Sequence, residues 1–329
     1  MSDAPVADAL LVGLVQDAVC AVSMHNAQPW CFRHHRATGT VDVLRDTARA
    51  MERSDPDNRG QYLACGAALL NLRVAAARAG LFAEVTLLPE SREPTLAASV
   101  RLRPAGGGDR QPALGGLYEA LRRRHTSRQP FVAEPVPHWL LAELSQQARA
   151  EDAWLDYPSA WHAALVAQLT AQCEAEADRL GDPDEAAWYE RPPAAGGEPV
   201  DGVPWYAVGP RPVRGRVPSR DFSRGTGRPR VAAEFESDPA MALLSTNADT
   251  PESWLHAGQA LERVLLHATH RGLATSLSSR ALEKEEQRWL LRDPTHGRGP
   301  VQMVLRLGYG PVGSITPRRP VADVLEFVD

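Results

Sequence analysis

The 329-residue chain has a single lysine, Lys284, within a Lys+Arg total of 36. A Walker-type phosphate loop ends in Gly-Lys-Ser/Thr, whereas Lys284 lies in Glu283-Lys284-Glu285, so the sequence excludes such a loop. A pyridoxal Schiff base would also require Lys284, and its carboxylate neighbours would raise the pKa of this amine rather than lower it. The near absence of lysine therefore removes two chemistries and leaves arginine as the main source of positive charge.

Cysteine is scarce as well, and long apolar runs are missing. The four cysteines form no Cys-x-x-Cys pair, which favours a reducing, cytoplasmic setting, although the sequence leaves a disulfide open. No apolar run approaches the roughly eighteen residues of a membrane span. Met1 to Gln16 has no basic flank, so we expect neither a secretory signal nor membrane association.

Charge and histidine spacing argue against two further classes of protein. The formal net charge of −5 disfavours a dedicated nucleic-acid binder, although it leaves room for a local basic patch. His34 and His35 would point to opposite faces of a strand. His267 and His270 lie three apart on an expected helix, but no carboxylate or cysteine cluster accompanies them. We therefore expect no metal site.

Residues 1–108 have the pattern of one α+β unit, which a run of three glycines at 106–108 separates from the rest. Apolar spacing and turn residues predict a helix over 7–18, a hairpin of Trp30–His35 and Thr40–Arg45 that turns at Thr38-Gly39, a helix from Leu63 to Ala77 closed by Gly80, and strands near Glu84–Leu88 and Ala97–Arg103.

The second part of the chain contains more helix. The pattern predicts helices through Leu114–Leu121, after Pro137 and over Ser159–Leu180, a strand at Met241–Thr246, and a helix with Pro251 at its first position behind Thr250. Between them, Arg191–Arg230 holds eight prolines and seven glycines. That density predicts no packed element there, and loops of this length are usually lids or linkers.

The last of these helices repeats an earlier one. At a constant offset of 192, identical residues recur in the pairs 66/258, 68/260, 69/261, 76/268, 80/272 and 81/273. Alanine-rich helices with a shared glycine cap could match by chance. Similar strands follow each helix, Val100-Arg101-Leu102 and Leu305-Arg306-Leu307, and this favours an internal duplication.

Three segments could carry chemistry. Ser23-x-x-Asn26-x-Gln28-Pro29-Trp30 gathers short polar side chains that can bond a heteroaromatic edge, or it is an ordinary capped turn with Trp30 in the core. The basic run 122–128 ends a helix and suits a phosphate, or it is a solvated face. Thr316-Pro317-Arg318-Arg319-Pro320 is a rigid basic elbow.

Together these segments resemble the nitroreductase family of flavin mononucleotide (FMN) proteins, and most closely its duplicated, single-chain Acg-type branch. Arg124-His125-Thr126-Ser127-Arg128 is similar to the family's Arg-x-Ser-x-Arg opening, and the runs 272–276 and 307–310 to its flavin-edge and last strands. Asp55-Pro56-Asp57-x-Arg59 and Asp201-Gly202-Val203-Pro204 look like features of the Acg-type branch.

The resemblance implies an α+β fold of two mainly antiparallel sheets flanked by helices, arranged as an intramolecular pseudo-dimer. We expect one repeat in residues 1–108, a second in 109–310 with a lid-like insertion at 191–230, and a C-terminal arm at 311–329 that crosses to the first half. Each half lacks the motif that the other keeps. The resemblance therefore implies one FMN per chain, and a monomer would suffice because the chain mimics a dimer.

The resemblance also implies the site residues. They are Ser23, Asn26, Gln28, Pro29, Trp30, Arg124, Thr126, Ser127, Arg128, Thr275, Ser276, Leu277, Ser278, Arg318 and Arg319. Arg124, Thr126 and one of Arg318 and Arg319 would hold the phosphate, and Arg128 would face N1 and O2 of the flavin. Trp205, Tyr206 and Phe222 could cover the ring.

Hydride transfer from NAD(P)H through FMN to nitro or quinone-like small molecules is the implied activity, with no obligatory side-chain base. The alternative is a protein that sequesters FMN beneath a tightly closed lid. From Arg211 to Arg230 there are seven arginines and one acid, yet no aromatic interleaving accompanies them, so we expect no nucleic-acid partner.

Overall fold

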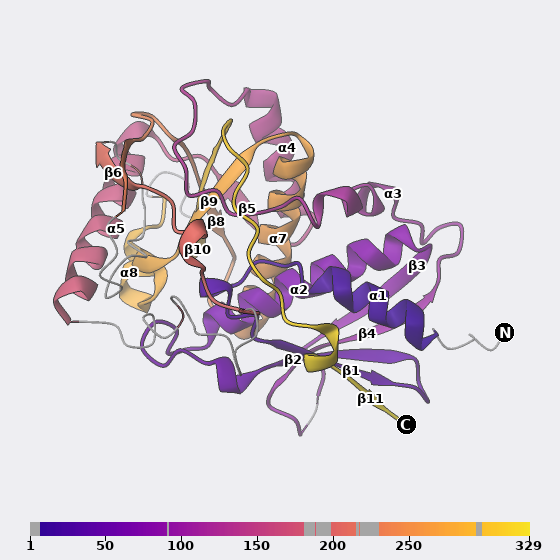
Figure 1. The fold of residues 1–329 in the computed structure, drawn as a ribbon. Helices are drawn as coiled ribbons and strands as arrows, with labels where there is room; N and C mark the ends of the chain where they lie inside the picture. The colour runs from indigo at the N-terminus through magenta and orange to yellow at the C-terminus, as the bar shows by residue number, and fades with distance from the viewer. Residues whose placement is uncertain are drawn as a thin grey trace.

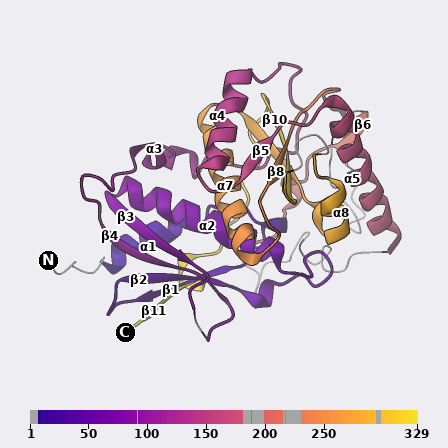
Figure 2. The same ribbon diagram turned by 180° about the vertical axis from the view of Figure 1, so that it is seen from behind.

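The computed structural model describes residues 7–90, 92–180, 188, 199–214, 217, 230–293 and 298–329. The described residues form two larger sheets, each with its own helices, and a small two-stranded sheet. The two halves meet along a pair of long central helices (Figures 1 and 2). The fold is α+β, as predicted. No helix among these residues is long and apolar enough to cross a membrane.

The first half contains a five-stranded sheet. Its strands, in the spatial order β11-β1-β2-β4-β3, are β1 (Trp30–His35), β2 (Thr40–Arg45), β3 (Leu81–Leu87), β4 (Leu96–Pro104) and β11 (Leu325–Val328). Every neighbouring pair is antiparallel except β1 with β11. Helices α1 (Asp8–Ala18) and α2 (Arg59–Arg78) pack their apolar residues against this sheet and bury Trp30 and Phe32.

The predicted hairpin is confirmed at the predicted residues. Trp30 pairs with Arg45 and His35 with Thr40, and Gly39 turns the chain at a φ of 69°, a conformation that glycine adopts without a steric cost. The C-terminal arm also crosses to the first half, where Phe32 of β1 pairs with Leu325 of β11. Figure 1 shows this yellow arm running from the second sheet to the first.

The second half contains a four-stranded antiparallel sheet. Its strands, in the order β5-β8-β10-β9, are β5 (Trp154–Asp156), β8 (Ala240–Ser245), β9 (Ala274–Ser278) and β10 (Val301–Gly308). Its helices are α4 (His138–Arg149), α5 (Ala160–Leu180), α7 (Pro251–His270) and α8 (Glu285–Leu290). Strand β10 is buried at every position, which is the expected pattern for a central strand covered on both faces.

Helices α2 and α7 cross at two glycines. A Cβ atom on Gly66 would lie 2.3 Å from the carbonyl oxygen of Leu255, and one on Gly258 would lie 2.1 Å from that of Leu63. Each glycine approaches the residue that lies three positions before the other glycine, so the two contacts are related by the same offset of 192 residues as the sequence repeat. Only glycine permits so close an approach of two backbones, so these two residues determine how the halves meet.

Two predictions about elements are wrong. The helix predicted through Leu114–Leu121 is split into α3 (Pro112–Gly115) and the 3-10 turn η3 (Tyr118–Ala120), because consecutive glycines at 115–116 weaken a helix at its middle. Within 191–230 the structure has the 3-10 turn η5 (Trp205–Ala207) and the strand β6 (Arg211–Arg214).

Among the described residues, strand β6 pairs only with β7 (Ala232–Glu234), in a two-stranded ribbon. Proline is tolerated in such an edge strand because its missing N–H faces away from the ladder, which explains how Pro212 is accommodated. The other 3-10 turns in the part of the chain that the structure describes are η1 (Met24–Asn26), η2 (Thr47–Arg49), η6 (Arg280–Leu282) and η7 (Val321–Asp323).

A two-compartment cleft between the halves

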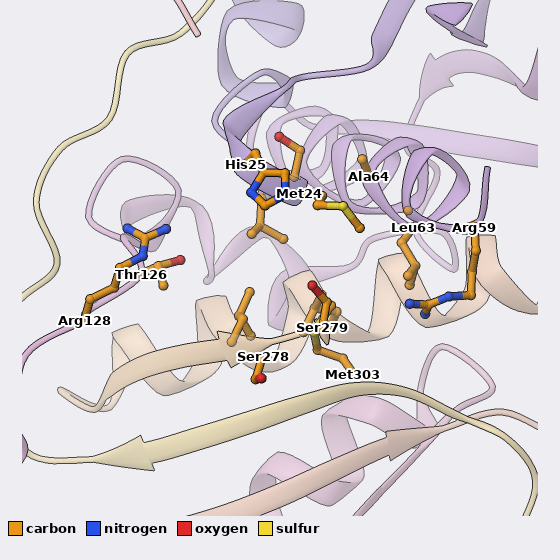
Figure 3. A pocket seen from close by; sticks show the side chains of 15 residues that line it. Met24, His25, Arg59, Leu63, Ala64, Thr126, Arg128, Ser278, Ser279 and Met303 are labelled. Atoms are coloured by element: carbon orange, nitrogen blue, oxygen red, sulfur yellow. The ribbon is translucent and has the colours of Figure 1, made fainter. Parts of the chain in front are cut away.

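A cleft lies between the two halves of the chain, and its larger compartment, here called the main chamber, encloses about 770 Å³ including its open mouth. One wall comes from η1 and the first turns of α2, and the other from the end of β9 and from β10 (Figure 3). Its lining residues are Val22, Ser23, Met24, His25, Arg59, Gly60, Leu63, Ala64, Thr126, Arg128, Leu261, Leu277, Ser278, Ser279 and Met303.

A smaller and more polar compartment, here called the arginine end, adjoins the main chamber. It has a volume of about 350 Å³ and shares Val22, Ser23, Thr126 and Arg128 with the chamber. Its further lining residues are Asn26, Arg124, His125, Thr316 and Arg318. The cleft therefore joins a largely apolar space to a polar one, as sites for amphipathic ligands commonly do.

The charged side chains of the cleft have one sign. Neither lining set contains an Asp or Glu, and each contains arginine. Burial and the neighbouring Arg124 and Arg318 guanidiniums lower the pKa of His125 to about 4, so this imidazole is neutral near pH 7. Four arginines thus give the cleft a local positive potential in a protein of net charge −5, and such a cleft attracts anions.

Arg124 is held by a carboxylate from helix α7. Its side chain is 2% exposed, and its Nε lies 3.1 Å from Oε1 of Glu262 on α7. Its Nη2 donates to the carbonyl oxygen of Cys20 at 3.0 Å. Burial raises the pKa of Glu262, and the Arg124 charge opposes that rise. The pair orients the guanidinium at the arginine end.

Arg318 converges on the same carbonyl group. Its Nη2 donates to Cys20 O at 3.2 Å and its Nη1 to Asn26 Oδ1 at 3.0 Å. Burial, with the neighbouring Arg124 charge, lowers the pKa of Arg318 to about 10, so it stays charged at neutral pH. Among the described residues, no carboxylate lies within 4 Å of its guanidinium.

The polar segment that follows α1 is conformationally strained. His25, Asn26 and Gln28 have φ values of 50°, 57° and 52°, in the left-handed region that costs non-glycine residues energy and is concentrated at functional sites. Asn26 Nδ2 donates to the carbonyls of Gly202 and Pro317. This one side chain thereby joins the first half, the 199–214 segment and the C-terminal arm beside the cleft.

The structure brings eight of the fifteen predicted site residues to the cleft lining: Ser23, Asn26, Arg124, Thr126, Arg128, Leu277, Ser278 and Arg318. The other seven have structural contacts instead. Trp30 is completely buried in the first core beside Pro29, as the capped-turn interpretation predicts. Gln28 Oε1 accepts from the Arg319 backbone N–H at 2.8 Å, and its Nε2 donates to Val200 O.

Ser127, Thr275 and Ser276 lie behind the wall. Ser127 N–H donates to Thr275 O at 2.8 Å, and Ser127 Oγ donates to Pro311 O, while Ser276 pairs with Arg306 of β10. These bonds hold the 124–128 segment along β9. The residues therefore position the wall and do not face the space.

Arg319 points away from the cleft and fastens the C-terminal arm to the first sheet. Its Nη1 donates to Gln28 O, Trp30 O and Asp46 Oδ2, and its Nη2 to Asp323 O, all between 3.1 and 3.2 Å. Of the two arginines considered for an anion, only Arg318 lines the cleft, because adjacent residues of an extended segment face opposite sides.

Arg319→Ala is expected to lower the free energy of unfolding by about 3 kcal/mol, since it leaves buried acceptors and Asp46 without their cation. Denaturation in urea measures this loss. Arg101→Ala, on an exposed position of the same sheet, should change stability by less than about 0.5 kcal/mol. Equal stability of the two variants would contradict the fastening role.

The predicted lid is only partly described. Trp205 packs against Val203, Ala207 and Val208, Tyr206 is 64% exposed, and Phe222 lies outside the described residues. Neither Trp205 nor Tyr206 is among the residues that line the cleft. The backbone of this segment does reach the site, since Arg128 Nη1 donates to Ala207 O at 2.9 Å.

Several cleft residues were missed by the sequence analysis. Met24, His25, Leu63, Ala64, Leu261, Ser279 and Met303 line the main chamber, and Glu262 pairs with Arg124. Helical periodicity marks Leu63 and Leu261 only as core positions. Arg59 belongs to the Asp55–Arg59 run, which resembles a feature of the Acg-type branch. That resemblance is the sequence signal that could have pointed to Arg59 as a site residue. The described residues contain no cluster of three or more metal-ligating side chains.

Comparisons with known proteins find relatives that match nearly the whole chain. The chain is 32% identical to "Putative NAD(P)H nitroreductase acg" of Mycobacterium tuberculosis H37Rv, with 98% of this chain and 97% of that protein covered. A second protein of that organism, whose name also begins "Putative NAD(P)H nitroreductase", is 29% identical over 94% of this chain and 89% of its own length. No model of a protein family matches the chain.

Among solved structures, a putative nitroreductase from Anabaena variabilis covers 83% of this chain and 69% of its own, with 14% identity and a TM-score of 0.42. A nitroreductase with bound FMN from Desulfitobacterium hafniense covers 65% and 98%, with 18% identity and a TM-score of 0.35. The full-length similarity to the acg protein, above 30% identity, establishes the relationship. The chain belongs to the nitroreductase family.

Proposed function

We propose that this protein binds FMN in the cleft and acts as an NAD(P)H-dependent oxidoreductase on small nitro or quinone-like acceptors. One observation carries the proposal. The arginine end, whose charged side chains are all arginines, adjoins a largely apolar chamber. FMN has the same division, since a nearly dianionic phosphate is joined through a polar chain to a flat aromatic ring. The NAD(P)H nitroreductase names of two relatives agree with this proposal.

The donor set fits this cofactor. Arg124, Arg318 and the Thr126 hydroxyl can hold the phosphate at the arginine end, because guanidinium forks match phosphate oxygens. Apolar side chains of the main chamber suit the ring. Leu277 and Ser278 line one wall, and their backbone groups would supply neutral polar contacts to the ring. When bound, FMN would accept a hydride from NAD(P)H and pass electrons to the acceptor. The protein would bind, orient and shield it.

We further propose one such site per chain, built from an internal duplication with repeats at 1–108 and 109–310 and an arm at 311–329. The reciprocal approach of Gly66 and Gly258 supports this, because the two contacts are related by the same offset of 192 residues as the sequence repeat. Ser23 and Asn26 come from the first half, and Arg124 and Arg128 from the second. A monomer would then hold a complete site.

The alternative proposal is sequestration of FMN. The 199–214 segment supports it, because its backbone is bonded to Asn26 and to Arg128 at the edge of the cleft. A segment that remained closed would exclude a nicotinamide donor and allow little turnover.

Anaerobic mixing of the yellow purified protein with NADH or NADPH separates the two proposals. We expect bleaching of the flavin absorbance within seconds, because the main chamber opens to solvent. Reduction with dithionite is the control, because it shows whether the bound flavin can be reduced at all. Bleaching by dithionite but not by either nucleotide would support sequestration, and colourless protein that binds no added FMN would contradict both.

A further inference from the structure

The main chamber has a second cation, Arg59, on the side opposite the arginine end. Figure 3 shows Arg59 and Arg128 at opposite sides of the space, with Met24 and His25 between them on one wall and Ser278 and Ser279 on the other. Arg59 is the first residue of α2 and is 2% exposed. Arg59 is not among the residues that line the arginine end.

Neutral groups hold Arg59 in place. Its Nη1 donates to the backbone oxygen of Gln302 at 2.7 Å and to its Oε1 at 3.1 Å, and its Nη2 donates to Leu282 O at 3.3 Å. These bonds use three of the five N–H groups of a guanidinium. The orientation of the side chain is therefore determined, while donors on Nε and Nη2 remain for another acceptor.

The charge of Arg59 has no close counter-ion. Among the described residues, no carboxylate oxygen lies within 4 Å of its guanidinium. The nearby Asp55 carboxylate is occupied by the backbone N–H groups of Gly60 and Gln61, and Asp249 pairs with Arg288. Burial lowers the pKa of Arg59 to about 10, so the group is still cationic at neutral pH. The charges of Asp55, Asp249 and Glu283 oppose this shift without touching the guanidinium. A buried cation that lacks a direct carboxylate contact is stabilised further by an anionic ligand.

We propose that Arg59 selects the electron acceptor, and that the preferred acceptors are small aromatic molecules that carry a carboxylate. The carboxylate would meet the guanidinium of Arg59. The aromatic ring would lie along Leu63, Ala64 and Met303 on the Arg59 side of the chamber and stack against the flavin ring, which would enter from the arginine end. A charge-assisted contact of this kind strengthens with burial. This inference rests on the proposed function, because it names the substrate class of that site.

The test compares 4-nitrobenzoate with its uncharged isostere 4-nitrobenzamide. Dissociation constants are measured by calorimetric titration on the protein as purified, with bound FMN quantified separately. We expect the wild type to bind the carboxylate at least about tenfold more tightly, Arg59→Gln to lose this preference, and Arg59→Lys to keep part of it because the charge remains without the fork.

Arg288→Gln is the matched control. Arg288 is also buried and donates to the same Leu282 carbonyl, but it does not line the chamber. It should therefore keep the preference for the carboxylate. Equal affinities for the two ligands in the wild type, or an unchanged preference in Arg59→Gln, would overturn the inference. If the wild-type protein is yellow but binds 4-nitrobenzoate and 4-nitrobenzamide equally, the result contradicts only the role of Arg59. If the protein is colourless and takes up no FMN, the result contradicts the proposed function.

Discussion

Arg124→Ala is expected to purify as colourless protein, with an affinity for FMN lowered by about 100-fold. The substitution removes a buried guanidinium from the arginine end, where charge-assisted bonds contribute about 1.5–3 kcal/mol each, and a loss of about 2.8 kcal/mol is roughly 100-fold in the dissociation constant. Fluorescence titration with FMN measures this effect. Riboflavin lacks the phosphate, so its weaker binding should change little.

Two controls make this result specific. Arg123→Ala alters the neighbouring, exposed arginine and should retain the wild-type affinity. Arg124→Ala also leaves Glu262 buried without its cation, which could destabilise the fold. The double variant Arg124→Ala/Glu262→Gln removes that unpaired charge and should restore stability but not FMN binding. Tight FMN binding by the single variant would contradict the assignment of Arg124 to the phosphate.

Gly258→Ala is expected to cause the largest loss of stability, about 3 kcal/mol or more, and to weaken FMN binding with it. The new Cβ would lie 2.1 Å from Leu63 O and 3.0 Å from the Cα of Gly66, and backbone atoms cannot rotate away as a side chain can. The two helices must separate, which opens packed contacts along the whole crossing. Because the cleft walls belong to α2 on one side and to β9, β10 and α7 on the other, the walls move too.

Urea denaturation and FMN titration measure the two effects. Gly13→Ala is the matched control, since Gly13 lies inside helix α1 with no heavy atom within 4 Å of its added Cβ. Alanine is a better helix former than glycine by about 0.5–1 kcal/mol, so this variant should be slightly more stable than the wild type. Wild-type stability of Gly258→Ala would contradict the close crossing.

The elements of the fold were predictable where the signal is local. The hairpin Trp30–His35 and Thr40–Arg45 has the predicted bounds, since alternation and a turn glycine act over a few residues. The helix from Pro251 begins where Thr250 accepts a bond from Ser253 N–H, as its capping residues predict. The prediction of a helix over 114–121 was wrong, because it gave the spacing of apolar residues more weight than the two adjacent glycines.

The site was predictable only in part. Arg124, Arg128 and Ser23 line the cleft as expected, because short motifs carry them. Gln28 and Trp30 share a segment with Ser23, and Arg319 lies in the third predicted segment beside Arg318, but these three residues have structural contacts. A motif indicates which residues occur together, and it does not indicate which side of the backbone each one faces once the segment bends through left-handed conformations.

The sequence by itself determined the local elements, the family resemblance and the fact that arginine must supply the cations of the site. The tertiary structure decided which arginines do so and what opposes them. Arg59, Arg124 and Glu262 come from segments separated by 65 to 203 positions. Arg59 and Arg124 line one cleft, and Glu262 pairs with Arg124, because the halves pack through the close approach of Gly66 and Gly258. The burial of these arginines, their counter-ions and their free donors arise only when the two halves pack together. A local sequence pattern therefore cannot predict them.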